Sequence, residues 1–121
     1  MKTENKILEM SFDFSLQIIE LYKRLVEKKE FVISKQLLRS GTGIGANVEE
    51  AIAGQSRKDF ISKMSIASKE ARETKYWLRL LDKSKLVDID FLVYLNSIEH
   101  LVNILTKIVK TASDVNVTNE N

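Results

Sequence analysis

Between Phe60 and Leu81 the apolar residues recur at alternating steps of four and three, and this spacing constrains the fold more than any other feature of the chain. Such a repeat keeps one apolar stripe on one side of a helix and predicts nearly parallel, left-handed packing against neighbouring helices. The stripe consists of Phe60, Met64, Ala67, Ala71, Thr74, Leu78 and Leu81. Ser56, followed three residues later by Asp59, resembles a capping box. We therefore expect one helix over residues 57–83.

Three further segments carry apolar residues at helical spacing. They cover about residues 3–28, about residues 34–53, and a stretch that follows an N-cap at Asp88 or Asp90 and ends near Ala112. The second is predicted to continue unbroken through Gly41, Gly43 and Gly45, which indicates close approach of a neighbouring helix. In the first, four residues are predicted to widen the buried stripe: Leu8, Phe12, Ile19 and Tyr22.

Composition excludes several fold and site classes. The chain has no cysteine and a single histidine, His100, which excludes disulfide frameworks, thiolate metal sites and any site that needs two imidazoles. The 121 residues include no proline and only 4 glycines, too little turn chemistry for an all-β fold. We predict an all-α protein, an antiparallel up-down-up-down four-helix bundle of left-handed twist, over residues 1–112. Residues 113–121 are predicted to form a frayed tail.

Two patterns admit a chemical interpretation beside a structural one. The run from Gly41 to Ala46 matches a dinucleotide-binding fingerprint, but that fingerprint requires a preceding strand, and the residues before it keep helical phase. Helix packing is therefore the preferred interpretation. Four glutamates could converge for acid–base chemistry, or could form a register-fixing network with Arg39 and Asn47, which we prefer. These glutamates are Glu49, Glu50, Glu70 and Glu73.

Positive charge is concentrated in one predicted helix. Residues 56–86 contain nine basic and four acidic residues, whereas the whole chain carries a net charge of only +2. Six residues of this segment share one side of the helix, opposite the apolar stripe, and are called the basic face below: Lys58, Lys69, Arg72, Tyr76, Arg79 and Lys83. Cations around a tyrosine suit phosphate contacts and base stacking. A solvated face, or one paired with acidic residues of a neighbouring subunit, is the open alternative.

Two stretches together resemble a known family. Residues 36–51 read QLLRSGTGIGANVEEA, and residues 59–81 contain the runs DFI, KEA and YWL. This combination resembles the signature of the bacterial 23S rRNA-intervening-sequence proteins, often described simply as four-helix-bundle proteins. The chain departs from the pattern at Gly43, where the family commonly has serine, and this departure favours a packing role over a hydroxyl there.

The resemblance implies a homo-oligomeric ring, a pentamer, and kinship with the basic, nucleic-acid-binding accessory proteins of diversity-generating retroelements. It also marks six positions for helix register or subunit contact: Arg39, Asn47, Glu50, Glu70, Glu73 and Trp77. We expect a non-enzymatic cytoplasmic homo-oligomer that binds structured RNA, or DNA, through the basic face, with no catalytic residue, metal, cofactor, membrane or small-molecule ligand. The alternatives are an oligomeric scaffold or protein-interaction module without a nucleic-acid ligand, and an enzyme that uses the glutamate cluster.

Overall fold

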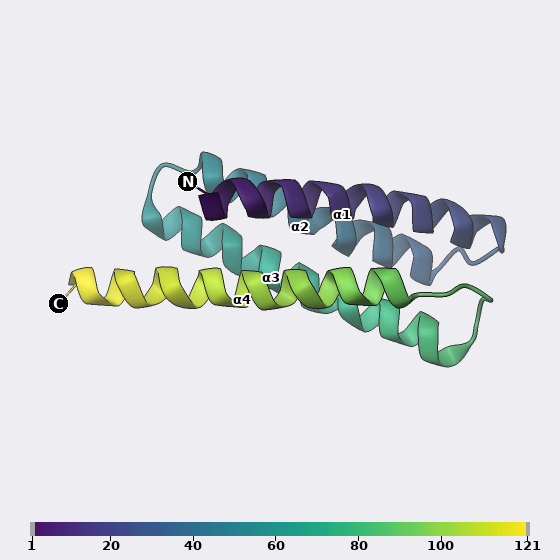
Figure 1. Ribbon diagram of the computed structural model, residues 1–121. Helices are drawn as coiled ribbons and strands as arrows, with labels where there is room; N and C mark the ends of the chain where they lie inside the picture. The colour runs from purple at the N-terminus through teal and green to yellow at the C-terminus, as the bar shows by residue number, and fades with distance from the viewer. Residues whose placement is uncertain (1, 121) are drawn as a thin grey trace.

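The described residues fold into four helices. The computed structural model describes residues 2–120, with side chains for residues 3–114. The helices are α1 (Lys2–Glu27), α2 (Ile33–Ala53), α3 (Arg57–Ser84) and α4 (Leu92–Glu120). They run alternately in opposite directions with short connections, so that α1 begins at the end of the bundle where α4 finishes (Figure 1). Residues 2–120 contain no strand, and the predicted all-α four-helix fold is confirmed.

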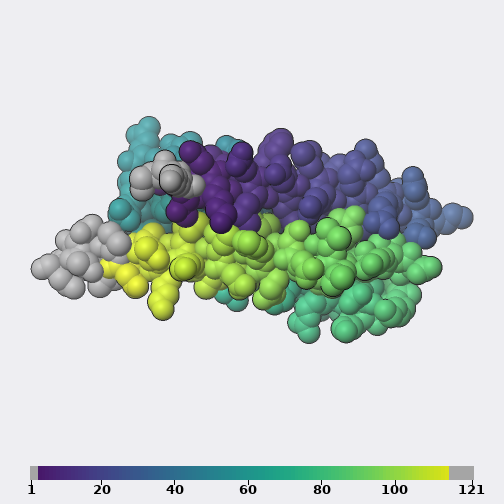
Figure 2. All heavy atoms as spheres, in the orientation of Figure 1, coloured from purple at the N-terminus to yellow at the C-terminus, as the bar shows by residue number. Residues whose placement is uncertain are grey.

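Each helix packs along the next one in the chain, and α1 closes the bundle against α4 less extensively than the other neighbours pack. The side chains of α1 and α4 meet along one face of the molecule (Figure 2). Within the described residues, α1 does not pack against α3, because these two helices lie diagonally across the bundle. Their outward faces consequently lie on opposite sides of the molecule.

The core confirms most of the predicted stripes. On α3, Phe60 is half-buried and the other six stripe residues are buried. On α1 the prediction of a wider stripe holds for Leu8, which packs against the core, and Tyr22 is half-buried. It is wrong for Phe12, which is 58% exposed, and for Ile19, which is 37% exposed. The side of α1 that faces its neighbours is already filled by other residues: Ile7, Phe14, Ile18, Leu21 and Leu25. Phe12 and Ile19 therefore point away from the core, as does Leu16.

The glycines of α2 lie inside an unbroken helix, as predicted, and they permit close helix packing. A Cβ atom at Gly41 would lie 2.9 Å from both γ carbons of Ile18 in α1. A Cβ atom at Gly45 would lie 3.3 Å from the carbonyl oxygen of Ser11. Larger residues at these positions would push α1 away from α2.

Polar side chains cap three helices. The hydroxyl of Ser56 accepts a hydrogen bond from the backbone N–H of Asp59 (3.1 Å), as predicted, and Asp90 accepts from the N–H of Leu92 (3.0 Å). Glu30 is buried, and its carboxylate accepts from the N–H groups of Ile33 (3.0 Å) and Ser34 (2.5 Å) at the start of α2. The helix α4 extends to Glu120, and Asn121 lies outside the described residues. Fraying of residues 113–121 stays a prediction.

Candidate nucleic-acid interface

The basic face lies on the outward side of α3. All six of its residues are exposed, and the side chain of Tyr76 is 52% exposed. An unbroken helix from Arg57 to Ser84 carries them, so the stretch between Lys69 and Lys83 is about 21 Å long. The structure thus places on one continuous surface the side chains that the sequence pattern grouped together.

The cations of the basic face are largely uncompensated. Within the described part of the chain, Lys69, Arg79 and Lys83 form no ion pair. Arg72 donates from Nη2 to the hydroxyl of Thr106 on α4 (3.0 Å), which positions its guanidinium without neutralising the charge. An anionic ligand would therefore meet charges that no carboxylate among the described side chains already neutralises.

Carboxylates border the basic face along both of its long edges. On the edge toward α4, the ammonium of Lys75 pairs with Glu99 at 2.6 Å. On the edge toward α2, Glu70 and Glu73 lie against Arg39. The unpaired cations of the basic face consequently form a strip along one side of α3.

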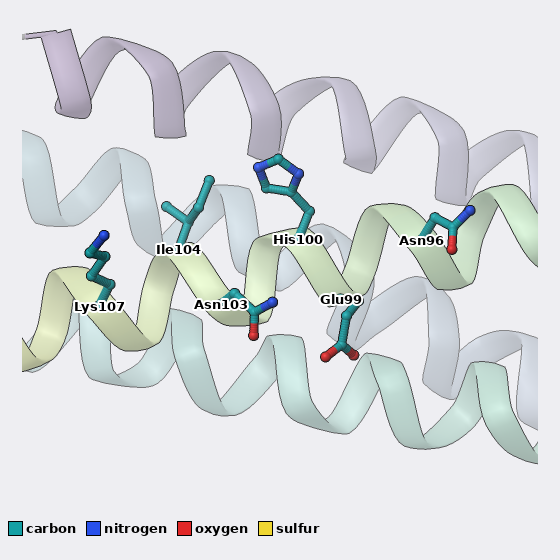
Figure 3. Close-up of a pocket in the computed structure, with 6 residues that line it drawn as sticks. All are labelled: Asn96, Glu99, His100, Asn103, Ile104 and Lys107. Atoms are coloured by element: carbon teal, nitrogen blue, oxygen red, sulfur yellow. The ribbon is translucent and has the colours of Figure 1, made fainter.

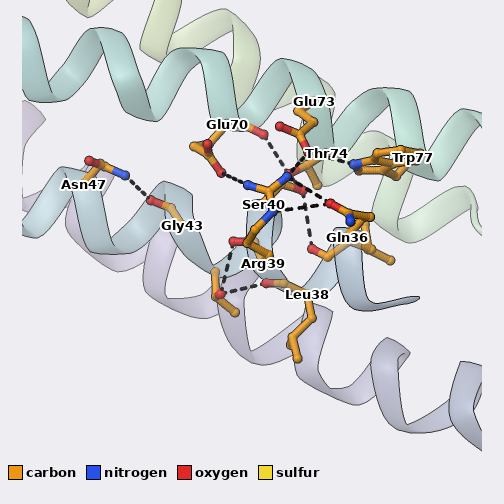
Figure 4. A network of polar contacts seen from close by, with 12 residues as sticks. Gln36, Leu38, Arg39, Ser40, Gly43, Asn47, Glu70, Glu73, Thr74 and Trp77 are labelled. Atoms are coloured by element: carbon orange, nitrogen blue, oxygen red, sulfur yellow. Dashed lines mark hydrogen bonds and ion pairs between the residues drawn. The ribbon is translucent and has the colours of Figure 1, made fainter. Parts of the chain in front are cut away.

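Arg39 of α2 links the two central helices through a polar network (Figure 4). Its guanidinium lies 3.4 Å from Oε2 of Glu70 and donates to the carboxylate of Glu73. The indole N–H of Trp77 donates to the same Glu73 carboxylate (2.9 Å). Gln36 accepts from Nε of Arg39 at 3.4 Å. The predicted ion-pair network between Arg39 and these two glutamates is present, and it fixes the orientation of Trp77.

Two other motif residues lie outside this network. The amide of Asn47 donates to the carbonyl oxygen of Gly43 within α2 (2.8 Å), and Glu50 pairs with Lys63 at 3.7 Å. Of the four glutamates that could converge, Glu70 and Glu73 share Arg39, whereas Glu50 lies elsewhere. Because α2 and α3 are antiparallel, positions further along α2 face the earlier turns of α3, and Glu50 cannot reach Glu70.

The environment of Glu70 favours its neutral form. Burial raises the pKa of this carboxyl above its ordinary value, and the neighbouring Glu73 carboxylate raises it further. Arg39 lowers the pKa but does not compensate fully. The carboxyl of Glu70 therefore retains its proton to a higher pH than an exposed glutamate does.

Sequence reasoning missed a buried polar contact beneath this network. The hydroxyl of Thr74 lies 2.9 Å from the hydroxyl of Ser40, and both side chains are buried between α2 and α3. The position of Thr74 in an otherwise apolar stripe was the available indication, because a buried hydroxyl needs a partner. The contact between Arg72 and Thr106 was also missed, since nothing in the spacing of α4 marks Thr106.

A shallow hollow on the outer side of α4 holds His100, the only imidazole of the chain (Figure 3). In this view His100 points toward α1, whereas Glu99 points toward α3. His100 is exposed. Among residues whose side chains are described, no three carboxylate or imidazole groups gather into a candidate metal site. No described helix is both long and apolar enough to cross a membrane.

Comparison with known proteins establishes the family. Residues 3–107 match the profile of the 23S rRNA-intervening sequence protein family, which is most of the chain. The chain belongs to this family. A solved crystal structure from Bacteroides thetaiotaomicron, described as a protein of unknown function from the S23 ribosomal protein family, is 46% identical. The alignment covers 89% of this chain and 98% of that one, with a TM-score of 0.84. No curated protein matches the chain.

In this 23S rRNA-intervening sequence protein, the motif that carries the resemblance and the basic face adjoin one another on α3. Glu73 and Trp77 belong to the motif network, and Tyr76 and Arg72 belong to the basic face one residue away. The network thus orients the helix surface on which the cations lie.

Proposed function

We propose that this chain is a non-enzymatic cytoplasmic homo-oligomer that binds nucleic acid, structured RNA in particular, through the basic face of α3. The observation that carries the proposal is the alignment of exposed cations on one face of one helix, with Lys69, Arg79 and Lys83 free of ion pairs among the described residues. Phosphate backbones are bound by such surfaces, because each neutralised phosphate releases counterions.

Exposed apolar side chains on opposite sides of the molecule support self-association. Phe12 and Leu16 are exposed on α1, and Ile66 and Leu80 are exposed on α3, which lies diagonally across the bundle. Two different apolar faces suit a head-to-tail contact, and head-to-tail contacts close into rings. A pentameric ring, as the family resemblance implies, is the assembly we propose.

The basic face would stay accessible in such a ring. Ile66 and Leu80 lie on the edge of α3 toward α2, on the same side as Trp77, from helical spacing. Arg72 lies on the edge toward α4, where its contact with Thr106 places it. A neighbouring subunit on the apolar edge would therefore leave the cations open to a ligand.

The proposal that the protein is not an enzyme rests on the contacts that its carboxylates make. Glu73 is engaged by both Arg39 and Trp77, which favours a structural role. His100, the one imidazole, lies on the far side of α4 from α3 and points toward α1. Glu73 and His100 therefore lie on different sides of the bundle and do not form an acid–base pair.

An oligomeric scaffold or protein-interaction module is the second candidate. The exposure of Phe12 and Leu16 favours this candidate, because a protein partner that packs on α1 would cover both side chains. In this candidate the basic face meets acidic groups of a neighbouring subunit, and residues 87–121, with two basic and five acidic residues, would supply them.

Light scattering with and without a structured RNA, over a salt series, separates these candidates. We expect an oligomer whose mass is stable to salt and which gains the mass of the RNA at about 50 mM salt and loses it as salt rises. A mass that falls with salt and never increases with RNA would overturn nucleic-acid binding in favour of the scaffold. A monomer under all conditions would overturn self-association.

A further inference from the structure

Tyr76 is the one aromatic residue of the basic face, and its ring packs against the indole of Trp77. Its centroid lies 5.1 Å from that of Trp77, and the two planes meet at 67° in an edge-to-face arrangement. The indole of Trp77 is itself held by its hydrogen bond to Glu73. The ring of Tyr76 is thus half-exposed, and the indole of Trp77 supports it. A half-exposed tyrosine contributes little to the core.

Cations surround this ring along the helix axis. Arg72 and Arg79 lie about one turn from Tyr76 on either side, and Lys69 and Lys83 lie about two turns away, from the spacing of the sequence. A strand of nucleic acid running along α3 would therefore contact cations both before and after it passes Tyr76.

We propose that the basic face binds an unpaired strand, with one base stacked on the ring of Tyr76; this rests on the proposed function. Stacking on a side chain needs a free base face, and only an unpaired, splayed base offers one. Within a duplex each base is already covered by its neighbours. The ligand would then be a single strand, or a loop of a structured RNA.

The width of the basic face favours the same ligand. The strip of free cations is bordered by Glu99 toward α4 and by Glu73 toward α2. A duplex presents two phosphate backbones separated by a groove, which is about 6 to 12 Å wide in B-form DNA. Its second backbone would lie over carboxylates that Lys75 and Arg39 already neutralise and would gain little there, whereas a single backbone can follow the unpaired cations between them.

The experiment compares two probes by fluorescence anisotropy, a labelled oligouridylate and the same strand annealed to oligoadenylate. The wild-type protein is expected to bind the single strand more tightly than the duplex. Tyr76→Ala is expected to weaken single-strand binding by about fivefold to 150-fold, the range for loss of one base–aromatic stack, and to leave duplex binding unchanged. Tyr76→Phe, the matched control, keeps the ring and is expected to retain the wild-type affinity.

The salt dependence separates stacking from charge. Tyr76→Ala removes no cation, so the slope of affinity against salt is expected to match that of the wild type, whereas Arg79→Ala is expected to reduce it. Equal single-strand affinity of Tyr76→Ala and wild type, or a duplex bound at least as tightly as the strand, would overturn the stacking proposal alone. Failure of both probes to bind would overturn the proposed function as well.

The fluorescence of Trp77 can report binding in the wild-type protein. This residue is the only tryptophan of the chain and touches the edge of Tyr76. Addition of unlabelled oligouridylate is expected to change its emission, and the duplex is expected to leave it unchanged. Unchanged emission at a saturating concentration of oligouridylate would contradict a base on Tyr76.

Discussion

Gly43 leaves the space that the carboxylate of Glu70 occupies: a Cβ atom added to this glycine would lie 2.8 Å from Oε2 of Glu70. At Gly41 the corresponding contact is with Ile18, a fully buried side chain of α1. The two glycines thus accommodate different kinds of neighbour, one a flexible polar chain end and the other a fixed part of the core.

This difference predicts opposite effects of alanine at the two positions. Gly41→Ala is expected to lower the free energy of unfolding by about 1–3 kcal/mol, because Ile18 cannot move without overpacking the core. Gly43→Ala is expected to be neutral or to raise it by up to about 1 kcal/mol, since Glu70 can rotate away and alanine favours the helix. Urea denaturation at one protein concentration measures both, and the reverse order would contradict the packing described.

The cap of α2 gives a second prediction. Glu30→Ala is expected to lower the free energy of unfolding by about 1–2 kcal/mol, because the N–H groups of Ile33 and Ser34 lose their acceptor. Glu27→Ala, at an exposed position on the last turn of α1, is the control and is expected to change little. Equal stabilities of the two variants in urea denaturation would show that Glu30 does not act as a cap.

The pKa of Glu70 predicts how stability depends on pH. Because the pKa of this carboxyl is raised in the folded state, the folded protein holds more protons than the unfolded chain, and this group lowers stability as pH rises above about 4.5. Glu70→Gln removes the ionisation, so the variant is expected to gain stability relative to wild type between acidic and neutral pH. Glu50→Gln controls for loss of one charge on α2. Thermal denaturation over this pH range provides the test. If wild type gained stability relative to Glu70→Gln as pH rises, the prediction would be contradicted.

The exposed side chain of Leu16 predicts the behaviour of the assembly. Leu16→Glu places a charge among the exposed apolar side chains of α1. We expect this variant to form smaller species than the wild-type oligomer, with helicity unchanged. Thr111→Glu, at an exposed polar position of α4, is expected to leave the mass unaltered. Light scattering and circular dichroism provide the measurements. A full-size oligomer of the Leu16→Glu variant would place the subunit contact elsewhere.

Helical periodicity predicted the four helices because each carries an apolar stripe strong enough to define its buried side. The same reasoning failed on the width of the stripe of α1. Periodicity places Phe12 and Ile19 next to the buried residues, but it does not show where the surface covered by a neighbouring helix ends. Both residues lie on the side of α1 away from α4, beyond the residues that contact α2, and the point where that contact ends is a tertiary property.

Site prediction succeeded for residues on one helix and for the ion pairs of Arg39 with Glu70 and Glu73, but not for Glu50, whose partner depends on how two helices are aligned. The basic face follows from the spacing of α3 alone. The separation of Glu50 from Glu70 depends on the antiparallel register of α2 and α3, which spacing within one helix does not reveal. Glu30 lies between the first two predicted helices, and its role as a cap was not predicted, because glutamate is not a usual N-cap residue and spacing does not show that it is buried.

The affinity of the Arg72→Glu/Arg79→Glu variant for a labelled RNA with single-stranded loops, measured by fluorescence anisotropy at about 50 mM salt, tests the central claim most directly. Lys6→Glu/Lys28→Glu makes the same change in net charge at two exposed positions, one in α1 and one directly after it, and is the matched control. We predict that the α3 variant binds more than about tenfold more weakly than the control, with helicity unchanged. Equal affinities of the two variants would contradict binding through the basic face.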